Sequence, residues 1–340
     1  MKMNKIFVFL LSVVAVGFGL TSCSDWTDDE SIDIDQSVSP DYQKYLENLR
    51  AYKNSDHKIV YAWFDNHEKT PYSRGQHVSD IPDSIDVVSL VYPDALADFE
   101  IKEIESLRND KGTKVVYTIS YNAIKKIYDQ RVKDETEKDP SYTPPAFLPY
   151  LSDTVSTALS FASTYNYDGI IAGYEGQSTV YMSEEDKAIY LANQAAFLNQ
   201  ITTWYKDNST KMLVFEGNPQ FLDDKSLLSS CKNIILNGSG VSYAGELSVL
   251  ISEAMVSGVP ADRFVIAAST TSVDTSDKKT GYFGNDRAII ESAYWITQGV
   301  SEYTKAGLGI YNVQNDYYNI AKVYEYVKES INIMNPAPTN

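Results

Sequence analysis

Basic residues are scarce in this 340-residue sequence. It contains 29 lysines and arginines against 46 aspartates and glutamates, which gives a formal net charge of −17. A chain this acidic repels phosphate backbones and anionic lipid head groups, so nucleic acid is not expected as a partner. Neutral or cationic partners are expected instead.

Histidine is scarce as well, and its positions do not suggest a metal site. The three histidines, His57, His67 and His77, have neither the spacing of one helix face nor that of a zinc motif. A Gly-rich phosphate loop is also missing after the first predicted strand. The sequence therefore predicts neither a metal nor a cofactor.

The first apolar run, Ile6–Leu20, is too short to span a bilayer comfortably. Lys2 and Lys5 precede it, and Leu20-Thr21-Ser22-Cys23 ends it. This order is typical of a cleaved signal peptide rather than a transmembrane helix. We therefore expect residues 1–22 to be removed.

Only two cysteines occur, Cys23 and Cys231. The Leu-x-Ser-Cys ending at Cys23 resembles the lipobox of bacterial lipoproteins, which implies that Cys23 is acylated and that its acyl chains hold the protein at a membrane. The alternative is an ordinary secretory signal that happens to end near a cysteine. If Cys23 is lipidated, Cys231 has no partner within the monomer, and a disulfide is excluded there.

An acidic stretch follows Cys23, and residues 23–45 are predicted to form a linker. Such a stretch resembles the surface-export signal of Bacteroidetes lipoproteins. It implies an outer-membrane protein that faces the cell exterior. A simple solvated tether is the alternative, and the two interpretations are compatible.

From about residue 57 onward, short β-branched runs alternate with longer amphipathic segments. Several runs are almost continuously apolar, as expected for strands that are covered on both faces. The predicted strands are Lys58–Phe64, Ser84–Tyr92, Thr113–Ser120, Tyr167–Tyr174, Met212–Glu216, Asn233–Asn237, Arg263–Ala268 and Gly307–Val313. The predicted helices are Asp98–Asn109, Ser152–Tyr165, Ser183–Lys206, Gly245–Val256, Asp286–Gly299 and Tyr317–Ile331.

Eight such repeats predict an α/β fold, a single (β/α)8 TIM barrel over residues 46–335. A doubly wound open sheet is the alternative. The polar, proline-containing segment Gln130–Pro149 follows the third strand and is predicted to be a long loop. It could form one wall of a cleft.

The fourth predicted strand carries the most informative motif. It runs from Asp168 and Gly169 to Glu175, so that a carboxylate stands at the carboxyl end of the strand. Barrels of this type place their catalytic groups at that end. A glutamate held protonated there could act as a general acid.

This motif resembles that of glycoside hydrolase family 18, the chitinases and endo-β-N-acetylglucosaminidases, whose fourth strand reads Asp-Gly-x-Asp-x-Asp-x-Glu. Asp168 and Gly169 fall on its first two residues, and Glu175 falls on the catalytic glutamate. The second, third and eighth strands are similar too, so that the resemblance covers about residues 57–335. The chain looks most like the family 18 lipoproteins of Bacteroidetes glycan-utilisation loci.

Two residues depart from the family motif. Ile171 and Gly173 stand where the second and third aspartates belong. The resemblance implies a mechanism in which the substrate's own acetamido oxygen attacks the anomeric carbon, and the third aspartate orients and stabilises that group. Gly173 can do neither, and Ile171 removes the support of the second aspartate. Glu175 would be an acid without its partner.

Three interpretations follow. We favour a barrel that binds N-acetylglucosamine-containing glycans, N-glycan or chitin-like, with little or no hydrolysis. The second is an active endo-glycosidase with Glu175 as general acid/base, in which Glu216, Asn218 or Asn237 replaces the missing aspartate. The third is a barrel with an unrelated role, in which Glu175 is a solvated residue at a strand end.

Aromatic residues are the remaining candidates for glycan binding. The sequence has 26 tyrosines against 12 phenylalanines, and tyrosine offers a sugar both an apolar face and a hydroxyl. Trp63 and Tyr311 could stack on sugar faces or pack in the barrel core. Tyr92, Tyr121 and Gln314 could line the cleft. The partners expected are a glycan, a membrane through the lipid on Cys23, and a neighbouring glycan-uptake complex.

Overall fold

The computed structural model describes residues 40–300 and 302–337. The predicted signal peptide, Cys23 and most of the predicted linker lie outside these residues. Helix α1 runs from Pro40 to Lys53. The end of the range predicted to be linker, residues 40–45, is therefore helical.

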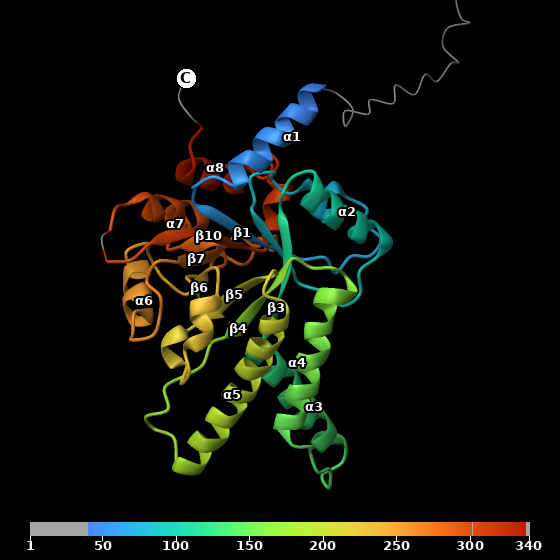
Figure 1. Cartoon of the computed structure of the whole chain (residues 1–340), viewed down its shortest axis with the longest axis vertical. Coiled ribbons are helices and arrows are strands. Elements are labelled where there is room, and N and C mark those ends of the chain that lie inside the picture. Colours follow the sequence, from blue (N-terminus) through green and yellow to red (C-terminus); the bar gives the residue numbers. More distant parts are fainter. Residues whose placement is uncertain (1–39, 301, 338–340) are drawn as a thin grey trace, which may run out of the picture. The chain divides into compact units, whose positions relative to one another are not determined.

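Eight parallel strands close into a barrel in the order β1-β10-β7-β6-β5-β4-β3-β2. All the predicted strands are present, with ends that differ by at most three residues. The (β/α)8 barrel is confirmed (Figure 1). The strands are β1 Ile59–Phe64, β2 Val87–Leu90, β3 Lys114–Ser120, β4 Gly169–Tyr174, β5 Met212–Gly217, β6 Ile234–Asn237, β7 Phe264–Ser269 and β10 Lys305–Tyr311.

Helices separate most of the barrel strands, as the repeat pattern predicts. They are α2 Asp98–Asn109, α3 Tyr121–Lys138, α4 Phe147–Thr164, α5 Glu184–Asp207, α6 Glu246–Ala254, α7 Ala288–Thr297 and α8 Glu325–Met334. Strands β8 (Tyr282–Phe283) and β9 (Asp286–Arg287) form a small antiparallel pair outside the barrel. In the described part of the chain, no helix has the length and apolar character needed to cross a membrane.

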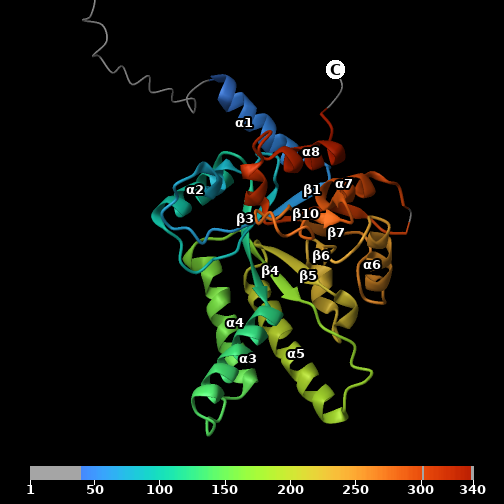
Figure 2. The same cartoon turned by 180° about the vertical axis from the view of Figure 1, so that it is seen from behind.

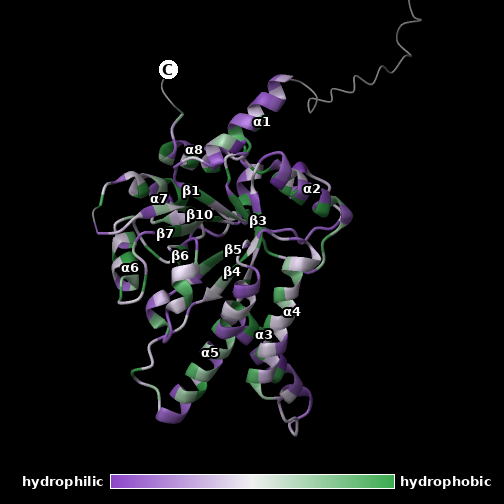
Figure 3. Ribbon diagram, viewed as in Figure 1, coloured by the Kyte–Doolittle hydropathy of each residue, from purple (hydrophilic) through white to green (hydrophobic). Residues whose placement is uncertain are grey.

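Side chains alternate between the two faces of the barrel wall, because successive residues of a strand point in opposite directions. On β1, Val60 and Ala62 join the large core beneath the helices. Tyr61 and Trp63 join a smaller core inside the barrel. Figure 3 shows apolar residues concentrated along the strands and a mixed pattern on the helices.

The segment Gln130–Pro149, predicted to be a long loop, is mostly helical, and this prediction was wrong. Helix α3 starts directly after β3, where the Ser120 hydroxyl accepts a hydrogen bond from the Ala123 amide. Its polar turns are linked by pairs such as Lys125 with Asp129, at 2.6 Å, which stabilise a helix that buries few residues. Only residues 139–146 form the loop that leads to α4.

Helices α3, α4 and α5 lie close together and extend away from the strands in both views (Figures 1 and 2). Their mutual packing includes the rings of Tyr121 on α3 and Phe197 on α5, 5.7 Å apart. The segment that the sequence analysis expected to be a loop thus belongs mostly to helices α3 and α4.

Candidate functional site

Glu175 lies one residue beyond the end of β4 and is exposed to solvent. Its backbone N–H donates a hydrogen bond of 3.0 Å to the side-chain oxygen of Asn122, at the start of α3. Gly176 follows with a φ of +62°, and a Cβ there would lie 2.7 Å from the Tyr174 ring. The chain therefore turns sharply after Glu175 and leaves its carboxylate at the mouth of the barrel.

Glu216 is the second carboxyl group of the mouth, and it comes from the neighbouring strand β5. Its register partner on β4 is Gly173. The Tyr311 hydroxyl, on β10, donates a hydrogen bond of 2.6 Å to its Oε1. The pKa of Glu216 is raised to about 7, mainly by burial and also by the charge of Glu175, whereas hydrogen bonding to the hydroxyls of Tyr311 and Thr118 acts to lower it.

The floor of the mouth is aromatic. The rings of Trp63 and Tyr311 lie 4.5 Å apart, at 49° to each other. The Trp63 Nε1 donates a hydrogen bond of 3.2 Å to the Thr118 hydroxyl, which lies 3.4 Å from the Ser89 hydroxyl. Gly309 makes room for this arrangement, because a Cβ there would lie 3.0 Å from the Trp63 ring. Four strands thus contribute to one connected floor.

The two positions that lack the family's aspartates are structurally different from each other. Ile171 is fully buried inside the barrel, in the same apolar cluster as Val116 and Val214. Gly173 pairs with Ser120 on one side, and a Cβ there would lie 3.2 Å from the Thr118 methyl group. The interior of β4 therefore carries no carboxylate below Glu175.

Asp168 and Gly169 lie at the opposite end of β4 from the mouth. The Asp168 carboxylate accepts hydrogen bonds from Arg108 Nε at 3.0 and 3.1 Å, and one from the Val115 amide at 2.9 Å. A Cβ at Gly169 would lie only 2.0 Å from the Met212 carbonyl oxygen. In this chain both residues hold strands together, and neither contributes to the mouth.

The other predicted residues are spread around the strand ends. Tyr92 is exposed, with its backbone held by the Asn66 side chain. The Gln314 side chain accepts a hydrogen bond from the Asp65 amide at 3.3 Å. Asn237 is exposed at the end of β6, and Asn218 is half-buried just after β5.

Tyr121 was predicted to line the cleft, but its ring lies on the helix side of the barrel wall. It is buried among rings from α4, α5 and β4, with the Tyr174 ring 5.0 Å away. Ser120, one residue earlier, is the register partner of the inward position 173. The alternation of the strand therefore turns Tyr121 outward.

Three polar residues of the mouth were missed: Thr118, Ser89 and Asn122. Thr118 follows Val116 at a spacing of two, which is the signal for a shared face of a strand. That spacing could have identified Thr118. The contacts of Ser89 and Asn122 depend on neighbouring strands and on α3, so no local pattern predicts them.

The three histidines are each paired with a carboxylate. The distances are 2.9 Å for His57 with Asp86, 2.9 Å for His67 with Asp65, and 2.5 Å for His77 with Glu103. Among the described residues, no group of three or more histidine, cysteine, aspartate or glutamate side chains is placed to hold a metal ion.

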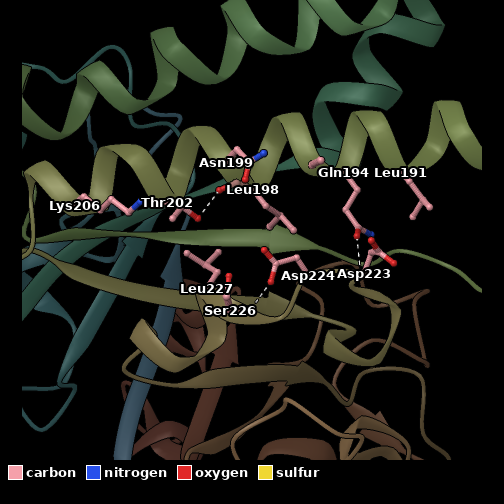
Figure 4. Close-up of a pocket in the computed structure, with 11 residues that line it drawn as sticks. Leu191, Gln194, Leu198, Asn199, Thr202, Lys206, Asp223, Asp224, Ser226 and Leu227 are labelled. Carbon is pink, nitrogen blue, oxygen red and sulfur yellow. Dashed lines mark hydrogen bonds between the residues drawn. The ribbon is translucent and has the colours of Figure 1, made fainter.

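A pocket of about 310 Å³ lies elsewhere, between α5 and residues 223–227 (Figure 4). The Gln194 side chain closes one part of it, because it accepts a hydrogen bond of 2.7 Å from the Asp223 amide. It also donates one of 3.0 Å to the Tyr174 hydroxyl. This pocket is lined by none of the residues that form the aromatic floor.

A barrel with a glutamate after β4 and an aromatic, carboxyl-bearing mouth has the features of a glycan-acting (β/α)8 protein. The chain belongs to glycoside hydrolase family 18, BT1044-like, whose family model matches residues 27–333. Family and fold together support a function related to glycans. A search of curated protein sequences found no match.

Solved structures with a similar fold include a selenomethionine Glu-to-Gln variant of BT1044, with 17% identity and a TM-score of 0.56 over 88% of this chain and 95% of that chain. The endo-β-N-acetylglucosaminidase from Cordyceps militaris has 16% identity and a TM-score of 0.56 over 86% and 96% of the two chains. A variant of it, in complex with fucosyl-N-acetylglucosamine-Asn, has 16% identity and a TM-score of 0.56 over 86% and 95%. At these identities the likeness shows the fold.

Proposed function

We propose that this protein captures glycans that contain N-acetylglucosamine at the mouth of its barrel, with little or no hydrolysis. The observation that carries the proposal is the interior of β4, where Ile171 is buried among apolar side chains and Gly173 has no side chain. Losing preorganised charge beside a reacting group typically costs a few kcal/mol, which is roughly hundredfold or more in rate.

The binding half of the proposal rests on the floor of the mouth. The half-buried Tyr311 ring, backed by the buried Trp63, offers apolar surface, and Glu216 and Glu175 offer hydrogen-bond acceptors in the same mouth. Sugars present apolar faces and hydroxyl donors in alternation, so they match this mixture. The Cordyceps relative in complex with fucosyl-N-acetylglucosamine-Asn supports the same class of ligand.

The test compares binding with product release. Calorimetry with N-glycans and chito-oligosaccharides measures the affinity, while an overnight digestion of the same glycans measures hydrolysis. We expect binding without product. Clear product release that Glu175→Gln abolishes would contradict the capture function, and no binding to any acetylated glycan would leave only an unrelated role for the barrel.

A second candidate is an active endo-β-N-acetylglucosaminidase in which Glu175 is the general acid/base. The specific observation in its favour is Glu216, whose pKa is raised in part by the charge of Glu175 in the same mouth. Two carboxyl groups in different environments are the usual arrangement for acid/base work. This candidate predicts product release that both Glu175→Gln and Glu216→Gln abolish.

The location of the protein is also a proposal. An acylated Cys23 would hold the barrel at the outer membrane, facing the cell exterior, beside an uptake complex that receives the glycan. Cys23→Ala is expected to move the protein from the membrane fraction to the soluble fraction after cell lysis. Retention of this variant in the membrane fraction would contradict a lipid anchor at Cys23.

A further inference from the structure

Glu216 brings a carboxyl group to the mouth from β5, at the level where β4 has only a glycine. The register places it directly beside Gly173, and Thr118 of β3 lies on the other side of that glycine. Because residue 173 has no side chain, none stands between Thr118 and Glu216 at this level of the barrel. The glycine thus admits a carboxyl group from the neighbouring strand.

We propose that Glu216 is the residue that recognises the acetamido group of the ligand, by accepting a hydrogen bond from its amide N–H on the floor of the mouth. This inference rests on the proposed capture of N-acetylglucosamine-containing glycans. It adds a specificity-determining residue on β5, outside the fourth-strand motif.

The Glu216 carboxylate has acceptor capacity left for such a ligand. A carboxylate offers about four lone-pair sites, and the Tyr311 hydroxyl occupies one of them. The Tyr311 hydroxyl also fixes the orientation of the carboxyl group, at 2.6 Å from its Oε1. A half-buried acceptor that is already held in place loses little further conformational entropy when a ligand binds.

The surroundings match an acetamido group in a second respect. The half-buried Tyr311 ring, which packs 4.5 Å from the buried Trp63 ring, provides apolar surface next to the acceptor. An acetamido group combines an N–H donor with an apolar methyl group, so one half can reach Glu216 while the other lies on a ring. A sugar with a hydroxyl at this position lacks the methyl group.

The charged and titratable groups that act on Glu216 are Glu175, after β4, and Tyr311, on β10. Burial and the Glu175 charge favour its protonated form, whereas the Tyr311 bond favours the ionised form. An amide N–H also favours the ionised form, because it donates to the carboxylate. Ligand binding near pH 7 should therefore release a fraction of a proton.

The experiment is calorimetry with chitotriose, and with cellotriose as the ligand that lacks acetamido groups. Titrations at pH 7 in buffers of different ionisation enthalpy report the proton release. We expect Glu216→Gln to weaken chitotriose binding by about tenfold or more and to abolish the proton release. Its effect on cellotriose should be small, and Glu253→Gln, an exposed position on α6, should change neither quantity.

Tyr311→Phe is the second variant, and it tests the proposal if Glu216→Gln does not fold. It removes the bond that lowers the pKa of Glu216, so the pH midpoint of chitotriose binding should move upward. Unchanged affinity and unchanged proton release in Glu216→Gln would overturn this inference and leave glycan capture standing. If the unaltered protein bound no acetylated sugar at all, glycan capture would fail, and this inference would fail with it.

Discussion

Glu216 is proposed to bind the ligand, but its burial lowers the stability of the folded protein at neutral pH. Its pKa rises from 4.5 to about 7 in the folded protein, mainly because burial disfavours the charged form. The folded state therefore binds a proton more tightly than the unfolded state. Stability falls as the pH rises from about 4.5 to about 7, and the whole penalty is present above pH 7.

Glu216→Gln should remove this penalty, because the amide carries no charge and its oxygen can still accept the Tyr311 hydrogen bond. We expect the variant to be more stable at pH 8 by roughly 1–3 kcal/mol and unchanged near pH 4. Urea unfolding at the two pH values measures this. Equal stability of variant and parent at pH 8 would show that Glu216 is solvated in the folded protein.

Gly173 is the second residue whose neighbours decide what a substitution would do. Gly173→Asp would restore one aspartate of the family motif, but its Cβ would lie 3.2 Å from the Thr118 methyl group and 3.3 Å from the Ser120 side chain. The new carboxylate would also stand next to Glu216. With Ile171 unchanged, we expect no hydrolysis of an N-glycan in an overnight digestion. Substantial product would show that the second aspartate position is dispensable.

At the scale of the element, the pairing of β4 with β5 depends on the absence of a side chain. Gly169 has Met212 as its register partner, and the Met212 carbonyl oxygen occupies the space that a Cβ would need. Gly240 offers a matched control, because nothing lies within 4 Å of its Cβ position.

Gly169→Ala should therefore destabilise the barrel by about 2 kcal/mol or more, since backbone atoms must move to admit the methyl group. Gly240→Ala should change stability by less than about 0.5 kcal/mol. Thermal or urea unfolding of the two variants measures the difference. Similar stabilities for both would mean that the strands can separate at this point without cost.

Helix α3 is the element that the sequence analysis misjudged. Its polar and charged residues indicate a loop when hydrophobic periodicity is the criterion, and only Tyr121 and Ile124 of the helix are buried. The helix forms because Ser120 caps it and because it packs beside α4. Pro149 did not prevent α4, since it lies in the first turn, where no helical N–H bond is lost.

At the scale of the barrel, the two ends of β4 differ in role: the residue at one end stabilises the fold, and the residue at the other end faces the mouth. Asp168 is tied to Arg108 and to the Val115 amide at the amino end, whereas Glu175 is exposed at the carboxyl end. In barrels of this kind, the amino end contributes stability and the carboxyl end contributes chemistry. The motif of the fourth strand thus combines a structural residue with a functional one.

Asp168→Asn should lower the free energy of unfolding by roughly 1–3 kcal/mol, because it leaves Arg108 without its charged partner. It should leave the affinity for chitotriose unchanged. Glu175→Gln should change stability by less than about 0.5 kcal/mol, because Glu175 is exposed. Weaker glycan binding in a folded Asp168→Asn variant would contradict the separation of the two ends.

The strand pattern by itself determined the architecture. Eight short apolar runs separated by longer segments indicate a parallel α/β fold of barrel size, because a parallel strand that is buried on both faces has a recognisable composition; the pairing of β1 with β10 then closes it into a barrel. The position of Glu175 at a strand end also followed from sequence alone. So did the absence of carboxylates at 171 and 173.

Only the tertiary structure decided what surrounds Glu175. Glu216, Thr118 and Tyr311 come from three different strands, and their contacts depend on the register and closure of the barrel. No local pattern encodes the half-buried position of Glu216 or the outward orientation of the Tyr121 ring. The physical reason is that hydrogen bonding and desolvation depend on neighbours in space, whereas strand composition reflects only whether a segment is covered.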